Sequence, residues 1–360
     1  MIYTREMKNF IQIRANIVAL PALFSATFAG GASHSLSTDD GGTRRPGYYE
    51  VCMRPADSAE RATIEVMNWR AGYPMKAGDD KICKGAEEGL KRLFHLKLHR
   101  EPFDPWWELS SLYPVSTVYG LRALSGSHNK FSDLKPLAGL VDLQTLIMWN
   151  NQIEDLSPLA GLRNLNMLLL TKNRIKDLSP LSRLSALNDL SVEENQITTL
   201  EPIQNLLRLE SLNCASNRIT SLSPVSKMTR MRYFYAGKNQ VTDLRPLSAM
   251  TSMHLASLDD NQISDLTGLE NMQKIDALDL HGNQLKDISL LAQLPTLRWL
   301  DLRSNQIQDY SHLAGLQDLK HLYIAGNPNE TLPAEVLALM QEHVNSKGEW
   351  IKLEVDVLKD

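Results

Sequence analysis

The sequence predicts an α/β solenoid, in which short parallel strands and irregular return segments repeat along one axis. The first observation is an asparagine that recurs every 22 residues, ten times, without an insertion or a deletion. The ten asparagines are Asn129, Asn151, Asn173, Asn195, Asn217, Asn239, Asn261, Asn283, Asn305 and Asn327. The second is an apolar residue two positions after each asparagine from Phe131 to Ile307. Stacked repeats need such a column, because one repeat cannot bury its apolar side alone.

Each repeat is expected to supply one strand, one turn and one return segment. The second repeat, residues 143–162, reads LQTLIMWNNQIEDLSPLAGL. Its first third alternates like a strand, and copies of a strand stack in parallel about 4.8 Å apart. The Asn151 side chain can pair turn backbone groups that would otherwise be buried and unsatisfied. Asp155 is suited to cap a short helical turn, and Pro158 fits the first positions of that turn.

The pattern LxxLxLxxN followed by IxDLxPLxxL resembles the leucine-rich repeat family. The 22-residue length and the D-L-x-P-L segment are similar to the bacterial internalin type, and the same length occurs in an intracellular phosphatase-regulator subfamily. The resemblance covers residues 121–329, about ten units. It implies a horseshoe with the parallel sheet on the concave face and short 3-10 or irregular turns on the convex face. It also implies a surface for binding.

The residues before the repeats predict an exported protein. Arg5, Lys8 and Arg14 precede the apolar run 15–26, and small residues follow at 29–33. This layout is typical of a secretory signal peptide, which we place at residues 1–32, with a linker at 33–47. A disordered or buried amphipathic leader is the alternative. No segment is long enough to anchor the chain stably in a bilayer.

Both ends of the array need caps, because a solenoid exposes its core there. Residues 48–120 are expected to form a helical N-terminal cap, with helices near 59–70 and 84–93 and a first strand at 94–98. Residues 330–360 are expected to form the C-terminal cap. There, a helix should run from Pro333 to about Val344, and a covering strand should lie at 350–355.

The three cysteines support export. Cys52 and Cys83 flank the first expected helix, and an exported context makes a disulfide between them the expected state. The segment from Cys83 to the first strand is similar to the cysteine-bearing caps of bacterial exported leucine-rich repeat proteins. Cys214 occupies an inward leucine position and is expected to be a buried thiol. We therefore expect a periplasmic or secreted monomer.

The concave face carries the candidate binding residues, and its side chains lie six, four, two and one positions before each asparagine. Aromatic and apolar side chains gather there in three groups, with acidic residues between them, and unpartnered exposed aromatics indicate a partner surface. The candidates are Ile147, Trp149, Leu169, Glu193, Tyr233, Tyr235, Asp259, Asp279, Trp299, Asp301 and Tyr323. Asp259, His281 and Arg303 occupy one column in successive strands, which predicts a charge ladder. We expect a protein or peptide ligand with basic residues.

Other functions have weaker support. A net charge of −4 with interspersed signs argues against nucleic acid. Ser257, Asp259 and His281 could be drawn as a catalytic triad, but no nucleophile elbow surrounds the serine. Asp259, Asp279 and Asp301 could bind calcium, but a binding loop is lacking. We therefore predict a non-catalytic binding protein without cofactor or metal. An intracellular scaffold and an enzyme that uses the cap or the acidic sheet remain the alternatives.

Overall fold

The computed structural model describes residues 48–98, 108–340, 343–344, 350–351 and 354–356. The predicted signal peptide at 1–32 and the linker at 33–47 lie outside the described residues. Within the described ranges, no helix is both long and apolar enough to cross a membrane.

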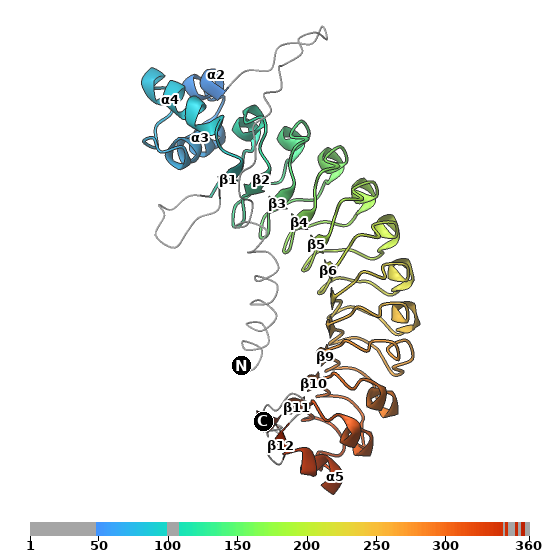
Figure 1. Ribbon diagram of the computed structural model, residues 1–360. Helices are drawn as coiled ribbons and strands as arrows, with labels where there is room; N and C mark the ends of the chain where they lie inside the picture. Colours follow the sequence, from blue (N-terminus) through green and yellow to red (C-terminus); the bar gives the residue numbers. More distant parts are fainter. Residues whose placement is uncertain (1–47, 99–107, 341–342, 345–349, 352–353, 357–360) are drawn as a thin grey trace. The chain divides into compact units, whose positions relative to one another are not determined.

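The repeats form one parallel sheet. In the described part of the chain it has twelve strands, in the order β1 to β11 followed by β14 (Figure 1). The strands are β1 His95–Lys97, β2 Ala123–Ser125, β3 Thr145–Ile147, β4 Met167–Leu169, β5 Asp189–Ser191, β6 Ser211–Asn213, β7 Tyr233–Tyr235, β8 Leu255–Ser257, β9 Ala277–Asp279, β10 Trp299–Asp301, β11 His321–Tyr323 and β14 Glu354–Asp356. Equivalent residues pair across the repeats, as Leu146 does with Leu168. The predicted α/β solenoid with a parallel sheet is confirmed.

Short 3-10 helices lie on the other side of the core from the strands (Figure 1). They are η1 Tyr113–Thr117, η2 Lys135–Leu137, η3 Ser157–Leu159, η4 Ser179–Leu181, η5 Glu201–Ile203, η6 Ser223–Val225, η7 Arg245–Leu247, η8 Ser289–Gln293 and η9 Ser311–Gly315. Proline is the second residue of η3, as expected. The capping prediction needs one correction, because the N-cap is Leu156 and Asp155 lies one residue earlier. The Oδ1 atom of Asp155 accepts the backbone N–H of Ser157 at 2.8 Å.

The recurring asparagine joins neighbouring repeats. In Asn261, Nδ2 donates to the carbonyls of Leu258 and Asp259 in its own turn and to Ala236 of the preceding repeat, at 3.0–3.1 Å. Its Oδ1 accepts the backbone N–H of Val241 at 2.9 Å. One side chain thus satisfies four backbone groups that the turn would otherwise leave without partners.

The residue before each asparagine adopts a left-handed backbone conformation. Two of these positions are glycine, Gly282 and Gly326. The others, with φ between 48° and 60°, are His128, Asn150, Lys172, Glu194, Ser216, Lys238, Asp260 and Ser304. Non-glycine residues rarely adopt this region. The turn geometry that the asparagine stabilises therefore overrides the local preference of the preceding residue.

The core lies between the sheet and the 3-10 helices. The inward positions are fully buried, and Cys214 is a buried free thiol, as expected. Tyr310 stands where most repeats have leucine and is also fully buried. Among the described residues, its hydroxyl is the buried side-chain polar atom that has no hydrogen-bond partner.

Three helices cover the first repeats: α2 Tyr48–Met53, α3 Ser58–Arg70 and α4 Asp80–Leu90. The expected disulfide joins α2 to α4 through Cys52 and Cys83, whose Cα atoms lie 5.7 Å apart. The Thr63 hydroxyl of α3 donates to the carbonyl of Ser111 at 2.7 Å, which ties the helices to the chain leading into η1.

The C-terminal segment differs from the prediction. The helix that begins after Pro333 is short, with α5 at Ala334–Leu337 and a 3-10 turn, η10, at Ala338–Met340. Two strands, β12 His343–Val344 and β13 Trp350–Ile351, pair with each other, and β14 alone extends the main sheet beside β11. The expected single covering strand is therefore divided into two.

Candidate functional site

We define the open face as the face of the sheet opposite the 3-10 helices. It carries the side chains six, four and two positions before each asparagine, such as Thr145, Ile147 and Trp149 before Asn151. All predicted binding residues occupy these positions. The solvent-exposed fraction differs among these residues, because neighbouring side chains on this face cover one another.

Trp149 is the most accessible aromatic of the predicted set, with 40% of its surface exposed. Ile147 and Leu169 lie beside each other on β3 and β4, and both are partly exposed. The sequence suggested that the Trp149 ring has no partner, but the ring does have one. It packs edge-on against His128, with the ring centroids 4.2 Å apart.

The other aromatic groups are also partly covered. Tyr233 stands edge-on to His254 at 6.3 Å, and Trp299 packs on Tyr323 at 5.3 Å. Tyr235 is only 7% exposed, although it occupies an open-face position. The expectation that Tyr235 is an exposed aromatic is therefore corrected.

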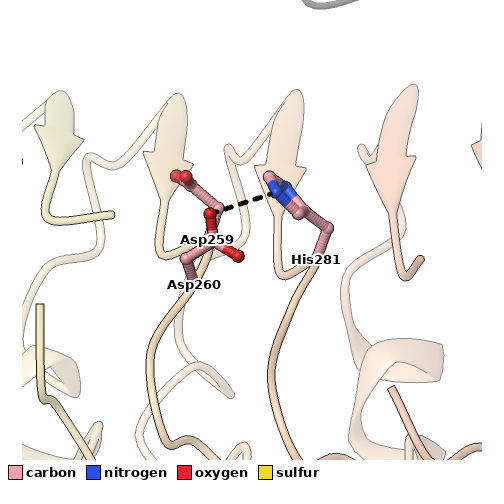
Figure 2. Close-up of side chains that lie close together, drawn as sticks. All are labelled: Asp259, Asp260 and His281. Carbon is pink, nitrogen blue, oxygen red and sulfur yellow. Dashed lines mark ion pairs between the residues drawn. The ribbon is translucent and has the colours of Figure 1, made fainter. Parts of the chain in front are cut away.

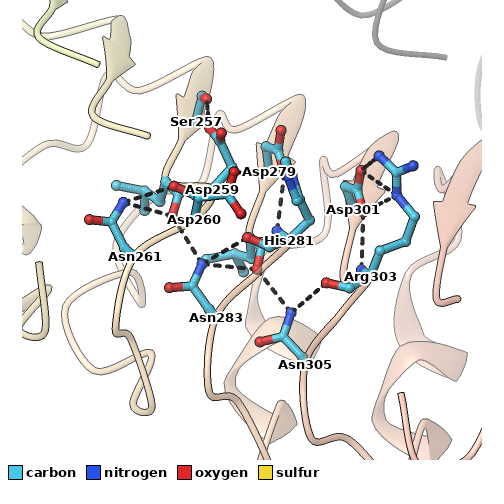
Figure 3. Close-up of polar contacts among 12 residues, drawn as sticks. Ser257, Asp259, Asp260, Asn261, Asp279, His281, Asn283, Asp301, Arg303 and Asn305 are labelled. Carbon is cyan, nitrogen blue, oxygen red and sulfur yellow. Dashed lines mark hydrogen bonds and ion pairs between the residues drawn. The ribbon is translucent and has the colours of Figure 1, made fainter. Parts of the chain in front are cut away.

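The acidic residues are paired along their own strands. Asp301 is fully buried and accepts Nε of Arg303 at 2.9 and 3.0 Å, together with a second guanidinium contact (Figure 3). Asp279, only 6% exposed, pairs with Nδ1 of His281 at 2.9 Å. Each cation bonds to the acid two residues before it, and His281 also lies within 4.8 Å of Asp259 in the predicted column.

The buried acid and histidine form a charged pair at neutral pH. Burial raises the pKa of Asp279, and the hydrogen bond from His281 opposes part of that rise. Burial alone would lower the pKa of His281, but its bond to Asp279 and the nearby carboxylates raise that pKa to about 9. Further along the sheet, burial raises the pKa of Asp189 to about 6, against a hydrogen bond from Ser211.

The arrangement gives Ser257 no general base. Its hydroxyl donates to Oδ1 of Asp259 at 2.6 Å, and no hydrogen bond joins it to His281 within the described ranges. The His281 ring is held instead by Asp279. The three residues considered as a triad therefore lie near one another without the contacts that nucleophilic catalysis requires.

Asp260 belongs to this group, although sequence reasoning did not select it. It occupies the left-handed position after Asp259, and its carboxylate lies 3.6 Å from Nε2 of His281 (Figure 2). Asp259, Asp260 and His281 can each direct one ligand atom to a common point, since these atoms lie within 4.8 Å of one another. The sequence signal was two consecutive acids one repeat before a histidine.

Comparison with known proteins identifies the class. The family model for Leucine Rich repeats (2 copies) matches residues 207–249 and 295–337. The matched segments, like the stacked 22-residue units, have the leucine-rich repeat pattern. Its structure is similar to that of the internalin InlF from Listeria monocytogenes, with 25% identity and a TM-score of 0.66. The alignment covers 82% of this chain and 88% of that one, so the protein is internalin-like.

Two further solved structures align with the chain. Internalin C2 of Listeria monocytogenes aligns with 79% of this chain and 100% of its own, at 24% identity and a TM-score of 0.49. The ectodomain of the Arabidopsis thaliana receptor kinase GASSHO1/SCHENGEN3, solved with CASPARIAN STRIP INTEGRITY FACTOR 2, has 20% identity and a TM-score of 0.52. Coverage is 61% of this chain and 32% of that one. No curated protein sequence gives a significant match.

Proposed function

We propose that this protein is an exported, non-catalytic receptor-type scaffold that binds a protein or peptide on its open face. The observation that carries the proposal is the partly exposed apolar group of Trp149, Ile147 and Leu169 on a repeat scaffold of internalin-like type. Clustered aromatic and aliphatic side chains of this kind supply most of the binding energy in protein interfaces.

The contact surface extends along the sheet. Tyr233 and the Trp299–Tyr323 pair would act as further anchors, because each keeps part of its ring accessible. Glu193 and Asp259 lie between the anchors, and both are partly exposed. These acids would select a partner with basic residues and would mainly affect its association rate.

The fully or nearly buried residues have a different role in this proposal. Tyr235, Asp279 and Asp301 cannot offer much surface to a partner. Asp279 and Asp301 would instead fix the positions of His281 and Arg303, which are partly exposed. Replacing Tyr235 should therefore affect folding more than partner capture.

Alanine substitution with a matched control tests the surface. Trp149→Ala and Trp299→Ala should each weaken capture of the native partner at least tenfold, with the partner recovered by crosslinking in the source cell and mass spectrometry. Tyr119→Ala removes an aromatic that is more exposed than Trp149 but lies outside the open face, and it should bind normally. Unchanged capture by both folded tryptophan variants would contradict the assignment.

Export is the second part of the proposal. The Cys52–Cys83 disulfide supports an oxidising compartment, where such bonds persist, and it disfavours an intracellular scaffold. Intact-mass measurement of the protein purified from its source should give a chain without residues 1–32 and with one free thiol, that of Cys214. An intact leader with three free thiols would favour the intracellular alternative.

A further inference from the structure

A mixed group of imidazole and carboxylate side chains lies on the open face where β8 and β9 end. Asp259 and Asp260 follow β8, and His281 follows β9 two residues after its last residue. Figure 2 shows the Asp260 carboxylate directed toward the ring of His281. Because equivalent positions of adjacent repeats lie one strand spacing apart, three potential ligands are brought together by the sheet alone.

The histidine ring is held from outside this group. Nδ1 of His281 is 2.9 Å from Oδ1 of Asp279, and the backbone N–H of His281 donates to the same oxygen at 3.1 Å. Asp279 is itself buried on the floor of the face (Figure 3). A carboxylate bound to one ring nitrogen leaves the other nitrogen as the ligand, which is the usual support for a metal-bound histidine. Here the remaining nitrogen, Nε2, faces Asp260 at 3.6 Å.

Two glycines make room for the carboxylates. A Cβ atom on Gly237 would overlap the Asp259 carboxylate, and one on Gly282 would overlap Oδ1 of Asp260. Both acids can therefore lie close against the neighbouring repeats, Asp259 toward β7 and Asp260 toward His281. A larger residue at Gly282 would displace the Asp260 carboxylate from its position beside His281.

The charges around the group are unbalanced. Arg303 is already engaged by Asp301 through a bidentate pair. Within the described residues of this cluster, Asp259, Asp260 and Asp279 therefore share a single imidazole. Three carboxylates and one imidazolium leave an excess of negative charge. A divalent cation bound at Nε2 would relieve that excess by replacing the proton on this nitrogen, which is released to solvent.

We propose that Asp259, Asp260 and His281 bind a first-row divalent metal ion, for which Zn²⁺ is the matching probe. One imidazole nitrogen with carboxylate oxygens suits Zn²⁺ better than Ca²⁺, which takes oxygen ligands. Zinc bonds of about 2.0–2.2 Å require ligand atoms roughly 3.3 Å apart, so the acids must close in by about 1 Å or slightly more. Asp260 is exposed and free to make that movement.

The neighbouring group of Asp279, His281 and Asp301 is a poorer candidate. Both of its acids are buried, and Asp301 is held by Arg303, so a metal there would have to displace an established ion pair. The proposed site departs from the sequence-based expectation of no metal, which had considered only an oxygen-ligated calcium loop. Three protein ligands would leave one position of a tetrahedral ion open to water or to a partner's side chain.

Calorimetric titration of the full chain with ZnCl₂, after treatment with a chelator, tests the site directly. The protein should bind one ion saturably in the micromolar range or tighter. His281→Ala and Asp260→Asn should each weaken that binding at least tenfold, and Asp279→Asn, which releases the ring, should weaken it about tenfold. His254→Ala removes a histidine of the same repeat that lies outside the group, and its affinity should match that of the native chain.

Circular dichroism in the absence of metal establishes that each variant is folded, and added Zn²⁺ should raise the melting temperature of the native chain but not of His281→Ala. Two results would overturn the proposal. One is the absence of saturable Zn²⁺ binding by the native chain. The other is an affinity of folded His281→Ala equal to that of the native chain, since the ion would then bind elsewhere.

Discussion

Replacing Arg303 by alanine should destabilise the array strongly, because the substitution leaves the fully buried carboxylate of Asp301 without its cation. In the native chain, Nε of Arg303 donates to both oxygens of Asp301, at 2.9 and 3.0 Å, and a second guanidinium nitrogen contacts Oδ2. The backbone N–H of Arg303 adds a bond of 3.0 Å, which the alanine variant retains. The side-chain contacts would be lost.

The expected loss follows from the burial of the acid. Removing one partner of a buried ion pair costs about 3–5 kcal/mol, because the remaining charge stays desolvated. Since Arg303 is partly exposed and one backbone bond to Asp301 survives, we place the loss near the lower end, at about 3 kcal/mol. The double variant Asp301→Asn with Arg303→Ala should recover part of that loss, as no buried charge then remains.

Urea denaturation followed by circular dichroism measures the difference in the free energy of unfolding. The matched control is Arg174→Ala, which removes an exposed arginine 3.8 Å from the exposed Glu154. That pair should contribute less than about 1 kcal/mol. If Arg303→Ala costs no more than Arg174→Ala, the reasoning from burial is refuted.

Three further substitutions test the packing, the electrostatics and the cap. Tyr310→Phe should raise the free energy of unfolding by about 1 kcal/mol, since it removes a buried hydroxyl without a partner. If urea denaturation gives a lower free energy of unfolding for the variant, the hydroxyl makes a hydrogen bond after all. The raised pKa of Asp189 means that its carboxyl stabilises the fold only at low pH, and this contribution is lost between about pH 4 and pH 6. Asp189→Asn should therefore stabilise the chain by about 2 kcal/mol more at pH 8 than at pH 4.5, and an equal effect at both would contradict the burial of that carboxyl. Cys52→Ser should lower the free energy of unfolding by about 3–4 kcal/mol, as expected for opening a disulfide with a sequence separation of 31. If the stability of the native chain does not change when reductant is added, the result contradicts this prediction.

The backbone was predictable because the repeat fixes it. Once Asn151 and its equivalents set the period, the parallel register and the 3-10 turns followed, and the structure has both. The helices after Pro333 were less predictable, because the segment leaves the repeat and no period constrains it. There, local signals alone gave a helix longer than the observed one.

The open face could be predicted only in outline. Counting from the asparagines assigns residues to the open face, but the count carries no information on rotamers or on pairing within a strand. The side chains of Arg303 and His281 each bond to the acid two residues earlier, Asp301 and Asp279, and the count could not show these pairs. Asp260 was counted among the outward acids but not selected, because the count does not show that its carboxylate lies 3.6 Å from Nε2 of His281.

The left-handed residue before each asparagine makes the repeats dependent on one another along one margin of the sheet. The side chain at this position extends toward the adjacent repeat. His128 therefore contacts Trp149, Lys172 lies 3.9 Å from Glu194, and Asp260 faces His281. A substitution on the open face would therefore alter the chemistry one repeat away. Combined mutations there should depart from additivity.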